Sequence, residues 1–339
     1  MLKIKDKYVV AVAGASGAVG NEIVNILEER EFPVDRLRLL ATDKSVGEDM
    51  DFEGSDMPVE PLQKGCFKDV DMVFFAAGPE ITKAWIAEAA SSGCIVIDCT
   101  SFSRMSSEVP LVVPEINSYD LSWHKGVIAN PSSAAVQLAS VLKPLNDTAV
   151  VKRVVMTMLQ AVSATSKSAM DELFTQTSDL LSFKDVKNKV YPHQIAFNLL
   201  PHVGQFVDND YTKEELRPLD ETKKMLRSRS LTGTVTAVRV PVFRGLSECV
   251  NIETEKKLTA AEVKELLSAA SGITVFDAPQ KNIYPFPLEA SGRDDIFVGR
   301  IREDESIACG INLWTVADNL RKGSALNAVQ IAEELIKKQ

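Results

Sequence analysis

The first thirty residues join a near-continuous apolar run to a glycine-rich turn and then to a helical pattern. Residues 7–13 (KYVVAVA) are typical of a strand buried on both faces. The turn 14–20 (GASGAVG) precedes residues 21–30, where apolar side chains recur at helical spacing. Further strand-like and helix-like segments alternate up to a short strand at 127–130. Because parallel strands need crossover helices, this order predicts a Rossmann-like, doubly wound parallel sheet.

The pattern changes after Pro144, where longer and more strictly alternating strands begin. Residues 233–242 and 247–255 alternate and are expected to form a pair of antiparallel strands. The remaining elements expected here are a strand at 151–159, helices at 168–181 and 259–270 (the second capped by Thr259), strands within 296–301 and 311–316, and a final helix at 322–339. We therefore expect an α/β domain formed by residues 1–131 plus 321–339, and an α+β domain with a largely antiparallel sheet at 132–320.

Composition narrows the classes of function. The 339 residues carry a net charge of −9 with a pI of about 5.1, which argues against a nucleic-acid partner. No apolar run approaches the length of a membrane span, so we expect no membrane partner and a cytoplasmic protein. The five cysteines form no CxxC pair and the three histidines are scattered, so reduced thiols and no metal site are expected.

The glycine-rich turn is a candidate phosphate loop. Glycines let the backbone approach a pyrophosphate, and the free N–H groups at a helix start favour an anion. The pattern is GxxGxxG rather than GxGxxG, but its place after a buried strand favours dinucleotide binding. The expected contacts are Gly14, Ser16, Gly17, Ala18 and Val19.

The end of the second strand bears on the choice between NADP and NAD. Asp43 could accept a hydrogen bond from a ribose 2′-hydroxyl and so favour NAD. Lys44, flanked by Thr42 and Ser45, suits a 2′-phosphate better. We expect NADP, with NAD as the alternative.

A second turn of interest follows the strand at 127–130. Residues 128–137 (IANPSSAAVQ) pass from a strand through Asn130-Pro131 into a helix that opens with two serines. Enzymes often mount a nucleophile at such an elbow. Ser132 and Ser133 are equally the residue type that caps a helix N-terminus.

Taken together, these segments resemble the aspartate-semialdehyde dehydrogenases over nearly the whole chain. The matching stretches are GASGAVG (14–20), ATDKSVG (41–47), VPLVVPEIN (109–117), LQAVS (159–163), HQIAFNLLPH (193–202), YTKEELRPLDETKK (211–224), RVPV (239–242), SECVNIETE (247–255), FVGRIR (297–302) and DNLRKGSALNAVQIAE (318–333). The resemblance implies a homodimer with an NADP-binding domain and a dimerisation/substrate domain. It also implies reduction of β-aspartyl phosphate to aspartate semialdehyde by NADPH with release of phosphate, a step toward lysine, threonine and methionine.

The resemblance assigns roles to particular residues. Arg104 and Lys224 match the family's phosphate contacts, Glu221 matches the carboxylate that takes the substrate amine, and Arg239 matches the partner of the substrate carboxylate. Gln160 matches a glutamine that orients the acyl group. Further cofactor contacts implied by the resemblance are Ser163, Ala164 and Asn319.

Two positions depart from the family pattern where its chemistry resides. Ser133 stands where the family has its nucleophilic cysteine, and Leu246 where it has its acid/base histidine. The glycine-rich SGAG that faces the nicotinamide is replaced by residues 163–166 (SATS), and the asparagine after VID by Cys99. A serine without an adjacent base is a poor nucleophile.

We therefore expect a protein that binds a dinucleotide and a small anionic amino-acid-like ligand, with the family activity very low or absent. One alternative is an active NADP-dependent oxidoreductase with an altered substrate or with Cys99 as nucleophile. The other is a non-catalytic regulatory or interaction partner of an active homologue.

Overall fold

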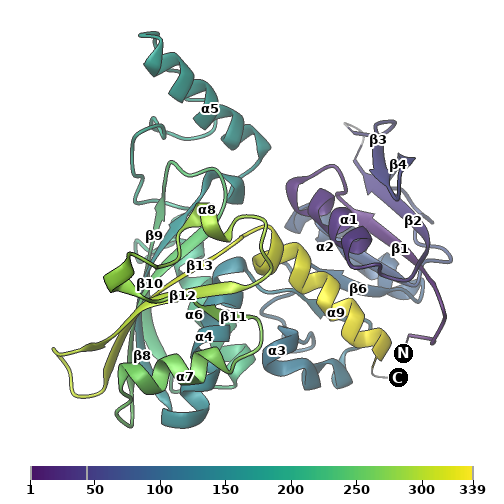
Figure 1. The fold of residues 1–339 in the computed structure, drawn as a ribbon. Helices are drawn as coiled ribbons and strands as arrows, with labels where there is room; N and C mark the ends of the chain where they lie inside the picture. Colours follow the sequence, from purple (N-terminus) through teal and green to yellow (C-terminus); the bar gives the residue numbers. More distant parts are fainter. Residues whose placement is uncertain (1, 43–44, 338–339) are drawn as a thin grey trace. The chain divides into compact units, whose positions relative to one another are not determined.

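The computed structural model describes residues 2–42 and 45–337, which form two compact units. Unit 1 contains residues 1–132 and 324–339, and unit 2 contains residues 133–323. Each unit is built around its own sheet (Figure 1). No helix within the described residues is long and apolar enough to cross a membrane.

Unit 1 contains a seven-stranded sheet in the order β3-β4-β2-β1-β5-β6-β7. Its strands are β1 (Tyr8–Ala13), β2 (Val34–Ala41), β3 (Asp49–Phe52), β4 (Ser55–Pro61), β5 (Met72–Phe75), β6 (Ile95–Asp98) and β7 (Val127–Ala129). All neighbouring pairs are parallel except β3 with β4. The predicted doubly wound parallel sheet is confirmed.

The helices of unit 1 cover the sheet with apolar faces. They are α1 (Ala18–Glu29), α2 (Pro79–Ser91), α3 (Pro114–Asn117), the 3-10 helix η1 (Ser118–Trp123) and α9 (Leu326–Lys337). Helices α1 and α9 share one core with the sheet, in which Ile26 and Ile331 are fully buried. The Arg30 guanidinium also pairs with the Glu333 carboxylate at 2.7 Å. Long-range packing of this kind ties the C-terminal helix to the first strands of the chain.

Unit 2 contains a six-stranded sheet in the order β11-β12-β13-β10-β8-β9. Its strands are β8 (Val151–Gln160), β9 (Thr232–Arg239), β10 (Leu246–Thr254), β11 (Ile273–Val275), β12 (Ile296–Asp304) and β13 (Gly310–Ala317). The pairs β8·β10, β10·β13 and β12·β13 are antiparallel, whereas β8·β9 and β11·β12 are parallel. The largely antiparallel sheet expected from the alternating strands is confirmed.

The expected pairing of residues 233–242 with 247–255 is wrong. Strand β8 lies between β9 and β10, so the two run in opposite directions without being neighbours. Alternation shows that a strand has two unlike faces, but it does not identify the strand beside it. Residues 240–245 are the crossing connection between β9 and β10, past β8.

The helical segments of unit 2 are α4 (Ser133–Ala149), η2 (Val162–Ala164), α5 (Lys167–Leu181), α6 (Lys213–Leu226), α7 (Ala260–Ser268), η3 (Pro279–Lys281), α8 (Pro287–Ala290) and the π-helical turn η4 (Arg321–Ala325), whose last residues pass into unit 1. Thr259 caps α7 as predicted, because its hydroxyl accepts from the Glu262 N–H at 3.2 Å. Figure 1 shows α5 extending away from the sheet of unit 2, with a long loop returning from it.

Candidate functional site

Three of the predicted site residues lie side by side across three neighbouring strands of unit 2. Gln160, the last residue of β8, is opposite Arg239 on β9 and opposite Leu246 on β10. The sheet register therefore brings together residues that are far apart in the sequence. The structure places a guanidinium, an amide and an isobutyl group in one row at the ends of these strands.

A cavity of about 580 Å³ opens beside the Gln160 and Arg239 end of this row. Its wall carries Tyr191, Phe206 and two of the three histidines, and His202 stacks on the Phe206 ring at 4.4 Å between centroids. His193 and Glu214 also line the cavity. Sequence reasoning treated the histidines as scattered, so it missed this grouping, which depends on how the loop after α5 folds back.

Arg239 is a buried cation at the wall of this cavity, with 5% of its surface exposed. Its Nη1 donates to the Ala161 carbonyl at 2.7 Å, while its Nε has no hydrogen-bond partner among the described residues. Burial lowers the pKa of the guanidinium from its ordinary value, opposed by nearby Tyr191 and Glu214. Arginine stays protonated in proteins, so the buried Nε–H is a donor without an acceptor among the described residues.

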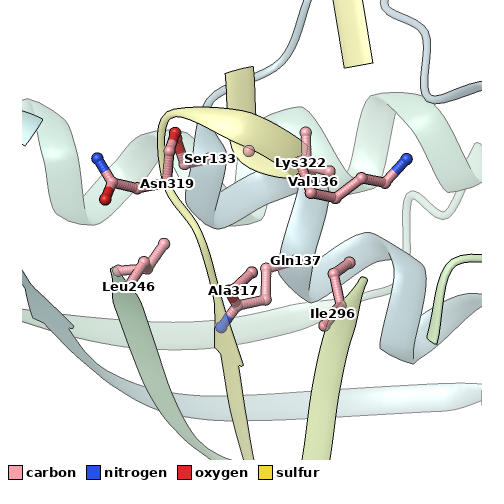
Figure 2. Close-up of a pocket in the computed structure, with 9 residues that line it drawn as sticks. Ser133, Val136, Gln137, Leu246, Ile296, Ala317, Asn319 and Lys322 are labelled. Carbon is pink, nitrogen blue, oxygen red and sulfur yellow. The ribbon is translucent and has the colours of Figure 1, made fainter. Parts of the chain in front are cut away.

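Ser133 shares a recess with Leu246 and belongs to a polar cluster centred on Asn319 (Figure 2). The Ser133 hydroxyl donates to the Asn319 backbone carbonyl at 3.0 Å. The side-chain oxygen of Asn319 accepts from the Ser163 hydroxyl at 3.0 Å and from the Gly245 N–H at 2.8 Å. Asn319 thus joins three segments of unit 2, and the Ser133 proton is committed to a carbonyl.

Ser133 is half-buried beside a narrow recess that both polar and apolar residues line. The recess that Ser133 shares with Leu246 has essentially no volume for a water molecule, and Leu246 is 2% exposed. Gly323 lies so close that a Cβ on it would meet the Ser133 Cβ at 2.6 Å. Lys322 also lines this space, but its amino group extends away from Ser133 in Figure 2. No imidazole or carboxylate is among the residues that line this described recess.

A buried carboxyl group lies two residues beyond Leu246 on β10. Glu248 has no exposed surface, and its Oε2 accepts from the Thr315 hydroxyl at 3.4 Å. The Gln137 amide donates to the same Thr315 hydroxyl. The other Glu248 oxygen and the Gln137 oxygen lack partners within the described residues, and burial raises the pKa of Glu248 well above its ordinary value. Sequence reasoning missed this group, although Leu246, Glu248 and Val250 fall on one phase of the strand.

Helix α6 carries two further predicted residues. Thr212 and Glu215 form a capping box at its start, which fixes where the helix begins. Glu221 is buried and Lys224 is half-buried, and their spacing of three residues places them on one side of the helix. The structure therefore places a carboxylate and an ammonium group on the same side of α6.

In unit 1, Arg104 connects the ends of two strands. Its Nε donates to the Asn130 carbonyl at 2.9 Å and an Nη donates to the Cys99 carbonyl at 3.1 Å. Cys99 itself is buried, and this burial, with smaller help from Asp98, raises the pKa of its thiol against the effect of Arg104. A thiol in this setting stays protonated and is a weak nucleophile.

The glycine-rich turn of unit 1 has the geometry of an anion cradle. Gly14 has φ +91°, and a Cβ on it would meet the Ala77 backbone nitrogen at 2.6 Å. A Cβ on Gly20 would meet the Gly14 carbonyl oxygen at 2.1 Å. Helix α1 begins at Ala18 with no acidic residue in its first turn, and Ser16 and Gly17 are exposed. Close backbone packing thus requires glycine at positions 14 and 20, and no side chain of the described residues caps the start of α1.

The residues considered for the ribose are described only in part. Thr42 is exposed directly after β2, and Ser45 donates its N–H to the Thr42 carbonyl at 3.2 Å. Asp43 and Lys44 lie outside the described residues. The other predicted cofactor residues, Ser163, Ala164 and Asn319, belong to unit 2. Within 2–42 and 45–337, no group of three His, Cys, Asp or Glu side chains could hold a metal ion.

Comparison with known proteins gives matches over both units. Residues 9–124 match the family model described as semialdehyde dehydrogenase, NAD binding domain, and residues 142–322 match semialdehyde dehydrogenase, dimerisation domain. An aspartate-semialdehyde dehydrogenase of Aquifex aeolicus is 46% identical over 97% of this chain and 98% of its own length. One from Legionella pneumophila is 46% identical over 96% of this chain and 95% of its own length.

Solved structures of aspartate-semialdehyde dehydrogenases also match this chain over nearly its whole length. Aspartate semialdehyde dehydrogenase II of Vibrio cholerae, crystallised as a complex with ASA, matches with a TM-score of 0.95 and 41% identity, covering 98% of this chain and 99% of its own. A probable aspartate-semialdehyde dehydrogenase from Pseudomonas aeruginosa matches with a TM-score of 0.92 and 35% identity, over 98% of this chain and 99% of its own.

Proposed function

Since this chain belongs to the aspartate-semialdehyde dehydrogenase family, we propose that it binds NADP and a small anionic amino-acid-like ligand but catalyses the family reaction very slowly or not at all. The family reaction forms an acyl-enzyme on a nucleophile and then transfers hydride to it. Ser133 and Leu246 stand where the family carries its cysteine and histidine.

The surroundings of Ser133 carry this proposal. Its hydroxyl donates to the Asn319 carbonyl, and the recess it shares with Leu246 has no room for water. A serine hydroxyl must lose its proton to a base as it attacks, and leucine cannot accept one. The absence of general-base help costs about 10²- to 10⁴-fold in rate.

The proposed ligand site is centred on Arg239 and Gln160. The buried guanidinium with an unpartnered Nε suits a carboxylate, which forms charge-assisted bonds with arginine. Gln160 faces the same cavity and would orient the acyl group. Glu221 would take the ligand's ammonium group, while Lys224 and Arg104 would take a phosphate. Two backbone carbonyls of unit 1 hold the Arg104 guanidinium in place.

The proposed cofactor site is the loop containing Gly14, Ser16, Gly17, Ala18 and Val19, where the glycine packing supports a close approach of pyrophosphate. Thr42, Lys44 and Ser45 would favour the 2′-phosphate of NADP over NAD. The nicotinamide would lie near Ser163, Ala164 and Asn319. NADP would supply the hydride, while these residues would bind and orient it.

We also propose a homodimer. The dimerisation-domain match supports it, as does the apolar surface on and after α5. Phe174 and Leu181 on α5 are 65% and 70% exposed, and Phe183 is 99% exposed. An apolar patch of this kind is typical of an interaction surface.

The alternative in which Cys99 replaces the family nucleophile has weaker support. Its thiol is buried, and that burial raises its pKa away from the range in which a thiolate forms. A Cys99→Ser variant separates the two ideas, because any NADP-linked activity should survive it if Cys99 is not the nucleophile.

Calorimetric titration with NADP, NAD and L-aspartate tests the binding half of the proposal. We expect saturable NADP binding that is tighter than NAD binding, and aspartate binding that is weakened in Arg239→Lys. Equal affinity for NAD and NADP would overturn the cofactor preference. If no dinucleotide binds to the folded protein, the binding half of the proposal is wrong.

A further inference from the structure

We propose that Thr165 and Tyr191 form a positioning pair, which holds the Arg239 guanidinium in place at the cavity wall for a ligand carboxylate. This inference rests on the proposed function, because it gives Arg239 a ligand to bind. Thr165 and Tyr191 also line the cavity, and the role inferred for each is exerted through Arg239.

Two contacts and the position of Thr165 in the chain support the pair. The Tyr191 hydroxyl and the Thr165 hydroxyl lie 2.8 Å apart, a good hydrogen-bond distance. The Tyr191 ring lies under the guanidinium, with Arg239 Cζ 5.9 Å from the ring centroid. Thr165 follows directly after η2, so the bond fixes the Tyr191 ring to a segment next to the end of β8.

Arg239 needs such support because little else in the described chain holds it. Its Nη1 has the Ala161 carbonyl, but its Nε has no partner, and no carboxylate in the described residues forms an ion pair with it. A guanidinium over an aromatic face is stabilised by the ring, and more strongly when it is desolvated. The Tyr191 ring therefore offsets part of the cost of burying an arginine without a counter-ion.

The nearest carboxylate of the cavity is otherwise engaged. Glu214 lines the same cavity, and it forms an ion pair with Arg217 on the same helix. Arg239 is thus left with an aromatic partner rather than an anionic one. A ring attracts the cation without occupying its N–H groups, and the Nε–H left without an acceptor among the described residues is buried at the cavity wall, where a ligand carboxylate would pair with it.

The consequence is a coupling between the loop after β8 and ligand affinity. Removing either hydroxyl frees the Tyr191 ring and should weaken binding of a carboxylate by about fivefold, the effect typical of one neutral hydrogen bond. Because Thr165→Ala and Tyr191→Phe delete the same bond, the double variant should be no weaker than either single one. Thr165→Ser keeps the hydroxyl and should restore affinity.

Unit 2 contains a matched control. The Tyr211 hydroxyl lies 2.8 Å from the Thr234 hydroxyl, the same chemical pair at the same distance, five residues before Arg239 on β9. Tyr211→Phe and Thr234→Ala remove an equivalent bond about 17 Å along the strand. They should leave ligand affinity unchanged, whatever they do to thermal stability.

The experiment combines L-aspartate titration by calorimetry with the Arg239 Nε–H resonance in ¹H–¹⁵N NMR spectra of the full chain, assigned by its loss in Arg239→Lys. We expect Thr165→Ala and Tyr191→Phe to weaken aspartate binding and to move this resonance. Thr165→Ser and the Tyr211 and Thr234 variants should do neither.

Aspartate affinity and the Arg239 resonance together distinguish a failure of the positioning role from a failure of the proposed ligand. Normal aspartate affinity and an unmoved resonance in Thr165→Ala and Tyr191→Phe would overturn the positioning role, with the proposed function intact. If the unaltered protein binds no aspartate, the proposed ligand is wrong. The resonance then decides the positioning role: a shift in both variants supports it, and no shift overturns it.

Discussion

The two ends of the row formed by Arg239, Gln160 and Leu246 differ in what surrounds them. At the Arg239 end, a cavity of about 580 Å³ is lined by a largely buried guanidinium whose Nε has no hydrogen-bond partner among the described residues. At the Leu246 end, Ser133 is half-buried beside a recess with no room for water, and its hydroxyl proton is already bonded. We propose that one sheet holds a place suited to binding an anion beside a place unsuited to covalent chemistry.

This difference shows that binding and chemistry make separable demands on one fold. Binding needs an open volume and a charge without a partner, and both are compatible with a stable core. Nucleophilic catalysis needs a base at bonding distance and space for the acyl group. A leucine in a closed recess stabilises the fold by apolar burial but supplies neither.

Restoring the chemistry should give the largest effect. The double variant Ser133→Cys/Leu246→His supplies a thiol and an imidazole, and we expect its NADP-linked activity to exceed that of the unaltered chain by at least about 100-fold. Each single variant should gain far less, because nucleophile and base act as a unit. A folded, NADP-binding double variant without this gain would show that more than these two groups is missing.

Removing the charge of Arg239, at the cavity end of the row, should give the next largest effect, on ligand affinity. Arg239→Met should weaken L-aspartate binding by about 10- to 100-fold, since hydrogen bonds to charged groups contribute about 1.5–3 kcal/mol. Its free energy of unfolding should not fall, because an unpaired buried charge is replaced by an apolar side chain.

The control for Arg239→Met is Arg293→Met. Arg293 also lies near an aromatic ring, with its Cζ 5.6 Å from the Phe297 centroid, but its side chain is 56% exposed. Calorimetry and urea denaturation check both variants. Unchanged aspartate affinity in Arg239→Met would remove this arginine from the ligand site.

The buried Glu248 beneath the closed end predicts a smaller, pH-dependent effect. Its raised pKa keeps it protonated in the fold while the unfolded chain ionises above about pH 4.5. Stability is therefore lost as the pH rises. Glu248→Gln should remove this loss, so its stability relative to the unaltered chain should grow by up to about 1.4 kcal/mol per pH unit. Urea denaturation between pH 5 and 8 checks this, and a difference that stays constant with pH would contradict it.

The local sequence pattern predicted those parts of the fold that a single segment of the chain determines. The buried strand, glycine turn and helix at residues 7–30 required no distant partner to be recognised, and Thr259 capped its helix as expected. The β3–β4 hairpin was missed, although Glu53 and Gly54 both have positive φ at its turn, a combination typical of two-residue hairpin loops.

The strand order of unit 2 and the bonding within the candidate site depend on contacts between distant segments of the chain. Which strand lies between β9 and β10 is a matter of tertiary packing, and alternation does not encode it. The bond from Ser133 to Asn319 joins residues 186 positions apart, and the Tyr191 ring reaches Arg239 only through the fold of the loop after α5. The sequence therefore predicted which residue types form the site, but not which of their atoms are already engaged.

The proposal that the chain binds NADP without catalysing the family reaction is tested most directly by measuring NADPH formation. The purified chain is given aspartate semialdehyde, phosphate and NADP, and NADP binding is measured on the same sample. We predict saturable NADP binding and no NADPH formation above background. Turnover at about 1–10³ s⁻¹, the usual range for enzymes, that is lost in Ser133→Ala would contradict the account, because Ser133 would then be a working nucleophile.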